Sequence, residues 1–288
     1  MTTKLAELVT LLKLERIEEN LFRVQSQDLG WGTVFGGQVL GQALSAAVQT
    51  VPAERPPHSL HAYFLRPGDV SRPIVYTVDR ARDGGSFTTR RVVAVQNGQP
   101  ILNMSASFQI EEPGFSHQDP MPAAPAPDTL VTEQARFARF PLPDALRERA
   151  TGERAFDLRT SDPLTTDPFS APVQPPSRMV WLKASARLAD DPALHRYLLA
   201  YVSDFSFMTA SLLPHGVTWL SPGMQIASID HAMWFHRPFR IDEWLLHAVD
   251  SPSASGSRGF ARGRVFNQNG ELVASTAQEG LIRMRGKK

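Results

Sequence analysis

The sequence contains no cysteine among its 288 residues. This absence excludes a disulfide framework, a thiolate nucleophile and any cysteine-ligated zinc or iron–sulfur site. The chemistry of the chain must therefore rely on oxygen, nitrogen or backbone groups. Dividing the length by about 150 residues per domain predicts roughly two domains.

An excess of charge of one sign is also lacking. Lys and Arg number 30 and Asp and Glu number 29, which gives a formal net charge of +1. The balance of charge therefore does not favour nucleic acid or an acidic membrane surface as a partner. The hydrophobic fraction of 42% and the charged fraction of 20% are ordinary for a soluble protein with a sizeable core.

Long apolar runs are the third absence. No run approaches the roughly 18 apolar residues that a membrane span needs. Charged residues interrupt the leucines of residues 1–20, whereas a signal peptide needs an unbroken apolar core. The last residues, Arg285 to Lys288, differ from the peroxisomal Ser-Lys-Leu signal. We therefore expect a cytoplasmic protein without a membrane span.

Hydrophobic periodicity predicts helices and then strands in residues 1–111. Leucines at helical spacing predict a helix in the first dozen residues, and a nearly unbroken apolar stretch predicts a buried helix at 33–50. We expect a strand at 18–29, and after the buried helix a period of two predicts strands at 58–65, 74–82, 87–96 and 101–110. Asn97-Gly98 favours a hairpin between the last two, because both residues tolerate positive φ.

Proline dominates the next segment, with twelve of the 23 prolines in residues 112–176. Proline removes a backbone donor and fixes φ, so we expect a linker that wraps the surface, with a short helix at 132–138. The earlier pattern then returns in residues 177–288. It predicts a strand at 179–185, a long helix at 192–213 and strands at 224–235, 244–249, 258–267 and 272–283.

Two short segments match between the halves. His61-Ala-Tyr-Phe-Leu-Arg-Pro67 matches Ala232-Met-Trp-Phe-His-Arg-Pro238, and Val95-Gln-Asn-Gly98 matches Asn267-Gln-Asn-Gly270. The two matches have nearly the same offset along the chain, and the order of elements is shared, which indicates an internal duplication. We predict an α+β fold with two tandem units at 1–111 and 177–288, each a long helix packed on an antiparallel sheet, joined by the Pro-rich linker 112–176.

Familiar catalytic motifs are missing. The sequence has no Gly-x-Ser-x-Gly elbow, no Walker motif and no His-Glu-x-x-His. Gly30-x-Gly32-x-x-x-Gly36 lacks the spacing of a dinucleotide loop. His58 and His61 would point to opposite faces of a strand, so we interpret them as structural or substrate-facing rather than as metal ligands.

Three features could carry chemistry. Phe35-Gly36-Gly37-Gln38 opens the buried helix, where free N–H groups could bind an oxyanion or the glycines could simply allow close packing. Asp204 lies in an apolar helical pattern, where a partly desolvated carboxylate could take a proton from water or bond nearby groups. Ser228 and Gln278 lie on predicted strands, where each could serve a site or be a satisfied core residue.

Longer strings in both halves resemble the acyl-CoA thioesterase II family, which has a double hotdog fold. The matching strings lie at 34–44, 58–69, 82–87, 203–204, 230–239, 242–246 and 274–280. The resemblance implies hydrolysis of fatty acyl-CoA to free fatty acid and coenzyme A, with no metal and no organic cofactor. The family's catalytic carboxylate, water-orienting hydroxyl and glutamine fall on Asp204, Ser228 and Gln278.

The resemblance also suggests where the oxyanion binds. The glycine-bearing start of the helix is similar to the one that supplies an oxyanion-hole amide in related hotdog thioesterases, which points to Gly37. We add Gln38 and His58 as candidate oxyanion or substrate-binding residues. In the alignment of the two halves, Ser228 and Gln278 correspond to Pro57 and Ala106. We therefore expect one active site per chain, with amide donors from the first unit.

Some questions stay open at this point. The hotdog fold also includes enoyl-CoA hydratases and dehydratases, whose sequence pattern has an Asp and a His about five residues apart. In this sequence, Thr209 stands where that His would follow Asp204. A non-catalytic acyl-CoA-binding protein is another alternative. Hotdog units commonly pair further, so a homodimer or homotetramer is expected. Arginines that could contact coenzyme A phosphates, or lie solvated on the surface, are Arg90, Arg91, Arg258, Arg262 and Arg264.

Overall fold

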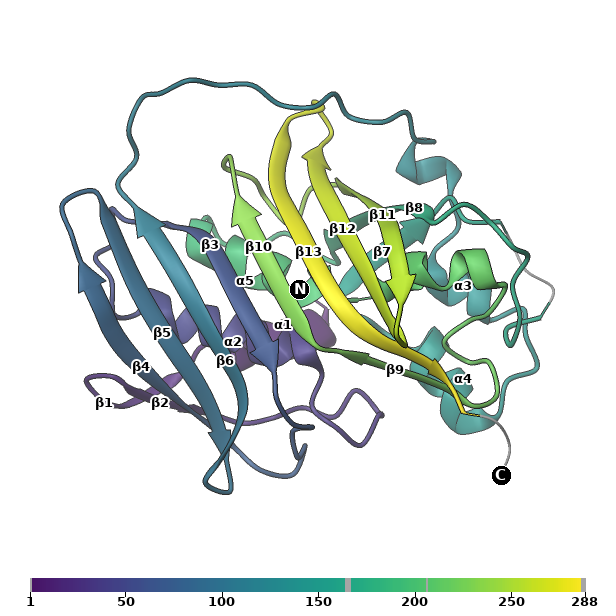
Figure 1. Cartoon of the computed structure of the whole chain (residues 1–288), viewed down its shortest axis with the longest axis horizontal. Helices are drawn as coiled ribbons and strands as arrows, with labels where there is room; N and C mark the ends of the chain where they lie inside the picture. Colours follow the sequence, from purple (N-terminus) through teal and green to yellow (C-terminus); the bar gives the residue numbers. More distant parts are fainter. Residues whose placement is uncertain (1, 164–166, 206, 286–288) are drawn as a thin grey trace.

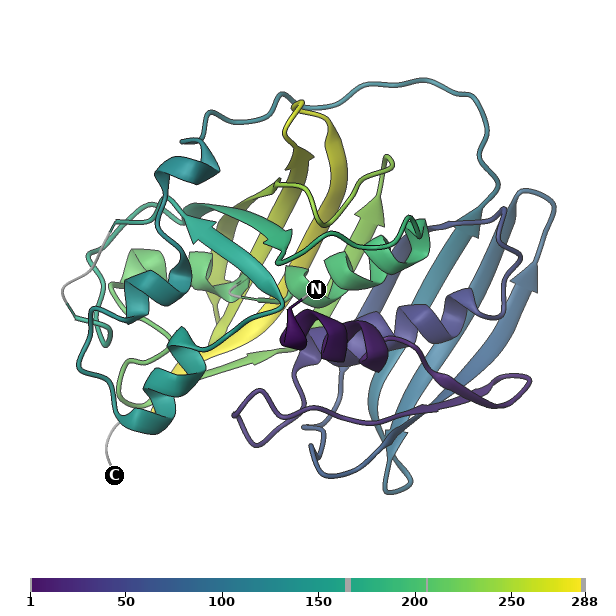
Figure 2. The same cartoon turned by 180° about the vertical axis from the view of Figure 1, so that it is seen from behind.

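The computed structural model describes residues 2–163, 167–205 and 207–285. Its strands form one curved antiparallel sheet, and the long helices pack against one face of it (Figures 1 and 2). The strand order is β1-β2-β4-β5-β6-β3-β10-β13-β12-β11-β8-β7, with β9 also paired to β13. The halves of the chain meet where β3 pairs with β10. This is the predicted α+β double hotdog arrangement.

The N-terminal unit confirms most of the predicted elements. The helices are α1 (Thr3–Leu11) and α2 (Gly36–Val48), and the strands are β1 (Glu15–Glu18), β2 (Leu21–Val24), β3 (Pro57–Phe64), β4 (Ile74–Asp83), β5 (Phe87–Gln96) and β6 (Gln99–Gln109). Asn97 and Gly98 have positive φ in the β5–β6 hairpin, as predicted. The single strand predicted at 18–29 is wrong. The Asp28 carboxylate accepts bonds from the N–H groups of Gly30, Trp31 and Gly32, which fixes a turn there instead.

The C-terminal unit repeats this order with one large difference. Its elements are β8 (Ser177–Ala184), α5 (Pro192–Ser203), the 3-10 turns η2 (Phe207–Ser211) and η3 (Leu213–His215), and the strands β9 (Met224–Ser228), β10 (Asp230–Phe235), β11 (Leu245–Ser255), β12 (Arg258–Asn267) and β13 (Leu272–Met284). The helix predicted to run to residue 213 instead ends at Ser203. The side chains of Ser203 and Asp204 bond residues of the sheet, so tertiary contacts override the apolar helical pattern.

Matching irregularities of the sheet support the internal duplication. The β4–β5 register shifts between Asp79 and Arg82, and the β11–β12 register shifts between Asp250 and Ser253, at the offset that relates His61 to Ala232. A second shift follows Ala94 in β5 and Val265 in β12, again at that offset. Bulges depend on local backbone geometry rather than on hydrophobicity alone. Two such coincidences indicate that both halves of the sheet share one ancestral backbone plan.

The Pro-rich segment does more than connect the units. It contains η1 (Pro127–Thr129), α3 (Glu133–Phe137), α4 (Asp144–Thr151) and β7 (Phe156–Thr160). The short helix predicted at 132–138 is thus confirmed as α3. Strand β7 pairs with β8 at the edge of the C-terminal sheet, and the segment folds over one end of that unit (Figure 2). No continuous helix or central strand forms among its described residues, as the prolines require.

The two central helices pack directly on each other. A Cβ on Gly37 would overlap the carbonyl oxygen of Tyr201, and a Cβ on Gly41 would lie 3.0 Å from the carbonyl oxygen of Tyr197. The two glycines lie four residues apart on one face of α2, so the backbones of α2 and α5 can approach closely. This contact places the start of α2 beside the end of α5. In the described part of the chain, no helix has the length and apolar character to cross a membrane.

Candidate active site

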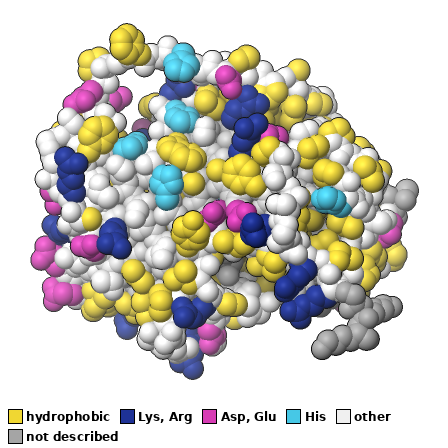
Figure 3. All heavy atoms as spheres, in the orientation of Figure 1, with side chains coloured by type: hydrophobic (Ala, Val, Ile, Leu, Met, Phe, Trp, Pro, Cys, Tyr) yellow, Lys and Arg dark blue, Asp and Glu magenta, His cyan; other side chains and the backbone are white. Residues whose placement is uncertain are grey.

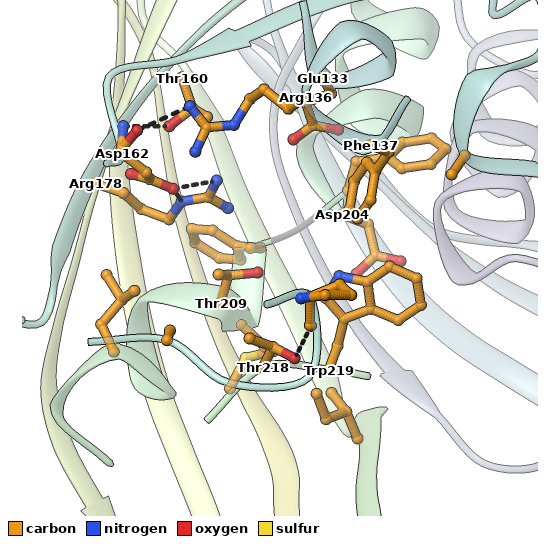
Figure 4. Close-up of a pocket in the computed structure, with 18 of the residues that line it drawn as sticks. Glu133, Arg136, Phe137, Thr160, Asp162, Arg178, Asp204, Thr209, Thr218 and Trp219 are labelled. Atoms are coloured by element: carbon orange, nitrogen blue, oxygen red, sulfur yellow. Dashed lines mark hydrogen bonds and ion pairs between the residues drawn. The ribbon is translucent and has the colours of Figure 1, made fainter. Parts of the chain in front are cut away.

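A cavity of about 490 Å³ lies beyond the C-terminal end of α5 (Figure 4). Three parts of the chain line it. The loop before α2 and the first residue of α2 contribute residue 31 and residues 33–36, the Pro-rich segment contributes α3 and α4, and the C-terminal unit contributes the end of α5, η2, β9 and β13. The lining includes Asp204, Ser228 and Gln278, which were the three residues predicted to be catalytic.

Those three side chains bond to one another. The Ser228 hydroxyl donates to Asp204 Oδ1 at 3.1 Å. The Gln278 amide Nε2 donates to Asp204 Oδ1 at 3.1 Å and to Ser228 Oγ at 2.6 Å. Asp204 caps the C-terminus of α5, Ser228 ends β9 and Gln278 lies within β13. Three elements far apart in the sequence therefore meet at one carboxylate oxygen.

His231 and Ser203 extend this network and were missed by sequence reasoning. His231 Nδ1 lies 2.6 Å from Gln278 Oε1, and its Nε2 lies 3.0 Å from Ser203 Oγ. Both side chains are fully buried. Burial lowers the pKa of His231, which favours the neutral ring. A signal was present in the sequence, because the duplication aligns His231 with Leu60, so the two halves differ here by a polar residue in place of an apolar one.

The start of α2 provides the backbone donors that the sequence predicted, although the two glycines have different surroundings. Gly36 lines the cavity, and a Cβ placed on it would lie 2.8 Å from Asp204 Oδ2. Gly37 instead packs against α5, and Gln38 is buried with its Oε1 accepting a bond from the Gln27 N–H. As the first residues of α2, Gly36 and Gly37 lack intrahelical acceptors for their N–H groups. The predicted oxyanion residue was Gly37, whereas Gly36 is the glycine that lies beside the carboxylate.

The prediction that His58 binds substrate does not fit this cavity. His58 lies at the other end of the sheet, where Nε2 contacts Ser107 Oγ at 2.8 Å and the ring meets Phe87 edge to face. It is not among the described residues that line the cavity. Its neighbour His61 contacts Trp234 on the uncovered face of the sheet, where Figure 3 shows histidines among hydrophobic and charged side chains. Sequence spacing alone gave no information on which end of β3 faces the site.

The arginines that were considered as phosphate contacts also lie outside the cavity lining. Arg258, Arg262 and Arg264 form exposed ion pairs with Glu279, Asp250 and Asp119. Arg90 is buried in the N-terminal unit, and Arg91 is exposed on the other face. The arginines that line the cavity are Arg136, Arg154 and Arg178. They lie in or beside the Pro-rich segment, which periodicity did not connect with the site.

These cavity arginines are held by specific partners. Arg178 pairs with Asp162 at 2.7 Å (Figure 4), and Arg154 pairs with Glu133 at 3.1 Å. Arg136 donates to the backbone carbonyls of Asp162 and Pro163, both at 2.8 Å. Burial lowers the pKa of Arg136. One wall of the cavity is therefore polar and cationic.

The opposite wall is aromatic. Trp219 contacts Trp31 edge to face at 5.4 Å between ring centroids, and it contacts Phe137 at 6.1 Å. The three rings come from the loop before α2, from the segment after η3 and from α3. Trp31 is 48% exposed, so this cluster borders solvent. Apolar walls with a few convergent polar groups are typical of small-molecule sites.

Comparisons with known proteins show the family of the chain. A family profile described as "Acyl-CoA thioesterase N-terminal domain" matches residues 26–109, and one described as "Acyl-CoA thioesterase" matches residues 147–281. The chain is 45% identical over 285 residues to acyl-CoA thioesterase 2 of Haemophilus influenzae, covering 98% of this chain and 99% of that protein.

Solved structures show the same relationship. The acyl-CoA thioesterase II of Mycobacterium marinum is 42% identical, with a TM-score of 0.80 over 97% of this chain and 99% of that one. A hot dog fold protein of Alicyclobacillus acidocaldarius is 21% identical, with a TM-score of 0.75 over 97% of this chain and 99% of that one, which supports the fold alone. The fold and these related proteins define a thioester hydrolase built from two hotdog units. The chain belongs to the acyl-CoA thioesterase II family.

Proposed function

We propose that this enzyme hydrolyses fatty acyl-CoA to the free fatty acid and coenzyme A with water activated by Asp204, Ser228 and Gln278. The observation that carries the proposal is the convergence of Ser228 and Gln278 on Asp204 Oδ1 in the lining of the cavity. The two bonds orient the carboxylate and occupy Oδ1. They leave Oδ2 on the side of Gly36, where a water molecule and the thioester carbonyl can meet.

The chemistry follows from these positions. Asp204 takes a proton as water attacks the thioester carbonyl carbon, and the carbonyl oxygen becomes an oxyanion. N–H groups at the positive start of α2, foremost that of Gly36, stabilise this oxyanion. Collapse of the tetrahedral intermediate breaks the C–S bond and releases the thiolate of coenzyme A. Because a thiolate is a good leaving group, no strong general acid is needed.

The enoyl-CoA hydratase or dehydratase alternative is not supported by the cavity. That chemistry was expected to use a His about five residues after an Asp, and the structure places Thr209 there, on the cavity lining. A thiol-release assay separates the possibilities directly. Hydrolysis frees one thiol per turnover, hydration frees none, and a binding protein shows saturable binding without turnover.

The decisive variant is Asp204→Asn, which keeps the shape of the side chain and removes its basicity. We expect kcat to fall about 10²–10⁴-fold, since general-base catalysis typically contributes that much. Asp230→Asn is the matched control. Asp230 lies on β10, next to the β13 strand that carries Gln278, and its carboxylate accepts a bond from the Glu279 N–H outside the cavity. Near-normal turnover of folded Asp204→Asn would contradict the proposal.

Oxygen labelling separates general-base attack from an anhydride. A single turnover in ¹⁸O-water places the label in the fatty acid when Asp204 acts as a base, and in the Asp204 carboxylate when it attacks the substrate. We expect the first result. The homodimer or homotetramer also stays a prediction, which analytical ultracentrifugation of the full chain can check.

A further inference from the structure

The orientation of the Gln278 amide is constrained by its own hydrogen bonds. Its Nε2 carries two protons, and both have acceptors, at Asp204 Oδ1 and at Ser228 Oγ. The carbonyl oxygen Oε1 must then point away from the carboxylate. Gln278 is 1% exposed, so Oε1 depends on a protein donor rather than on bulk solvent. A buried acceptor left without a donor costs about 1–3 kcal/mol.

His231 supplies that donor. The pairing of Ala232 with Ala277 places His231 opposite Gln278 on neighbouring strands. Its Nδ1 lies 2.6 Å from Gln278 Oε1, and an amide oxygen can only accept, so Nδ1 must carry the proton. On the far side of the ring, Ser203 Oγ lies 3.0 Å from Nε2 and 3.0 Å from the Ala200 carbonyl oxygen, so its single hydroxyl proton is shared between these two acceptors. The contact with Gln278 Oε1 thus selects the Nδ1–H tautomer of the neutral ring, and burial favours the neutral form.

We propose that His231 is a positioning residue, which locks Gln278 so that its Nε2 faces Asp204 and Ser228. It acts through the hydrogen-bond chain from Ser203 to His231, Gln278 and Asp204, and it does not touch the substrate. The cavity lining includes Gln278 but does not include His231 among the described residues. This inference rests on the proposed function, because it assigns His231 a role only through Gln278.

The N-terminal unit provides a built-in reference for this arrangement. The matching positions there hold Leu60 and Ala106, which pair with each other on β3 and β6. Both are buried in the hydrophobic core. The same backbone plan therefore accepts leucine at the position of His231. The difference between the two units is a hydrogen-bonded His–Gln pair in place of two apolar side chains, and only the unit with the polar pair contributes the carboxylate.

The first test compares two substitutions of one residue. His231→Leu introduces the side chain that the other unit uses and removes the donor to Oε1. We expect kcat to fall about tenfold to hundredfold with KM nearly unchanged, since the free energy of one unpaired buried acceptor corresponds to such a factor. His231→Asn places an amide N–H close to the position of Nδ1 and should restore most of kcat. Equal activities of wild type and folded His231→Leu would overturn the proposal.

The second test asks whether His231 acts through Gln278. In a Gln278→Ala background, His231→Leu should lower kcat by less than about twofold, because the group that it positions is gone. If the double variant instead loses kcat by the product of the two single losses, His231 acts independently of Gln278, and the proposal is overturned. His247→Gln is the matched control: His247 is also buried on the sheet and keeps a partner at Thr276, so kcat should stay within about twofold of wild type.

A third measurement reads the tautomer in the wild-type enzyme. Two-dimensional ¹⁵N–¹H spectra of histidine-labelled wild-type enzyme report which ring nitrogen carries the proton, and His231→Asn assigns the signal. We expect the Nδ1–H tautomer, and an Nε2–H tautomer would overturn the proposal. The experiments distinguish a failure of the proposed function from a failure of the positioning role of His231. Full activity of Gln278→Ala or Asp204→Asn would refute the proposed function, whereas inactive Asp204→Asn with fully active His231→Leu would refute only the role of His231.

Discussion

The two units use one sheet plan and fill matching positions with different chemistry. Across neighbouring strands, the N-terminal unit places Arg90 beside Ala106, whereas the C-terminal unit places Ala261 beside Gln278. Arg90 is 1% exposed. Its guanidinium donates to the Thr50 hydroxyl and carbonyl and to Asp83, so it ties the chain that follows α2 to the sheet. In the N-terminal unit, the buried Arg90 side chain therefore forms its hydrogen bonds with neighbouring residues of the same unit.

The small side chain of Ala261 has the opposite consequence. It packs in a cluster with Phe207 and Met208 of η2, in the region that follows α5. Helix α5 ends at Ser203, and Asp204 turns toward Ser228 and Gln278 at the cavity. The comparison teaches that duplication allowed specialisation. In one copy an internal arginine bonds the chain that follows the helix, and in the other copy the matching region borders the cavity that we propose as the catalytic site.

Acid stability should expose the largest difference between the units. Three buried histidines, His195, His231 and His247, belong to the C-terminal unit, and burial lowers the pKa of each, for His247 to about 3. The unfolded chain binds their protons below about pH 6.5, while the folded state resists protonation. Stability is therefore fully present above pH 6.5 and is lost as the pH falls toward 3. Each such histidine contributes up to about 1.4 kcal/mol per pH unit.

Urea unfolding of wild type and His247→Gln at pH 7 and pH 5 measures this effect. Glutamine can keep the bond to Thr276 but does not titrate, so the variant should lose less stability on acidification. His61→Gln is the control, because His61 is exposed in the N-terminal unit. An unchanged pH slope in His247→Gln would contradict the prediction.

Arg90→Ala should break the N-terminal unit without touching the chemistry. The change removes a buried cation and leaves several acceptors unpaired, so we expect a loss of about 2–3 kcal/mol in the free energy of unfolding. Activity per folded molecule should stay within about twofold. Arg91→Ala on the same strand is the control, since Arg91 is exposed and its loss should change stability by less than about 0.5 kcal/mol. Chemical denaturation and thiol-release rates report the two quantities.

The adjacent glycines at the contact between the units should separate stability from catalysis. Gly37→Ala forces a methyl group onto the Tyr201 carbonyl and should cost about 1–3 kcal/mol of stability. Gly36→Ala pushes a methyl group against Asp204 Oδ2 and should lower kcat at least about tenfold with a smaller stability loss. Gly85→Ala is the control, because a Cβ there meets nothing within 4 Å. Equal changes in stability and in kcat for Gly36→Ala and Gly37→Ala would contradict the separate roles assigned to these two glycines.

The smallest effects are expected from arginines outside the cavity lining. Arg262→Ala breaks an exposed ion pair with Asp250, and such pairs contribute about 0–1 kcal/mol. Its kcat/KM for acyl-CoA should change less than about twofold. Arg136→Gln lies in the cavity wall and releases two backbone carbonyls, so KM should rise. A larger rise in KM for Arg262→Ala than for Arg136→Gln would show that the phosphates bind on the outer face.

The sequence was most informative where one physical preference dominates locally. The period of two located β5 and β12, and Asn97-Gly98 marked the β5–β6 hairpin because positive φ is needed there. The pattern failed at Asp204, where helical periodicity continued through residues that the fold uses to leave the helix. It also failed at 18–29, where the Asp28 carboxylate accepts three backbone N–H bonds.

The candidate site residues were also predicted where a local sequence signal exists and missed where it does not. Resemblance to known motifs located Asp204, Ser228 and Gln278, and the structure brings all three together. The choice among Gly36, Gly37 and His58 depended on which direction each faces, which a residue string does not encode. The cavity arginines escaped prediction because they lie in or beside a Pro-rich segment without periodicity.

The sequence alone determined that the chain has two related units, that it cannot use thiol chemistry, and that its strands and central helices fall in matching order. These properties depend on composition, periodicity and repeated strings, all of which are local. Only the tertiary structure decided that Asp204 leaves its helix, that the Pro-rich segment completes the cavity, and that His231 bonds Gln278. Each of these depends on close approach between segments that are distant in sequence, where packing and hydrogen bonding outweigh local preference.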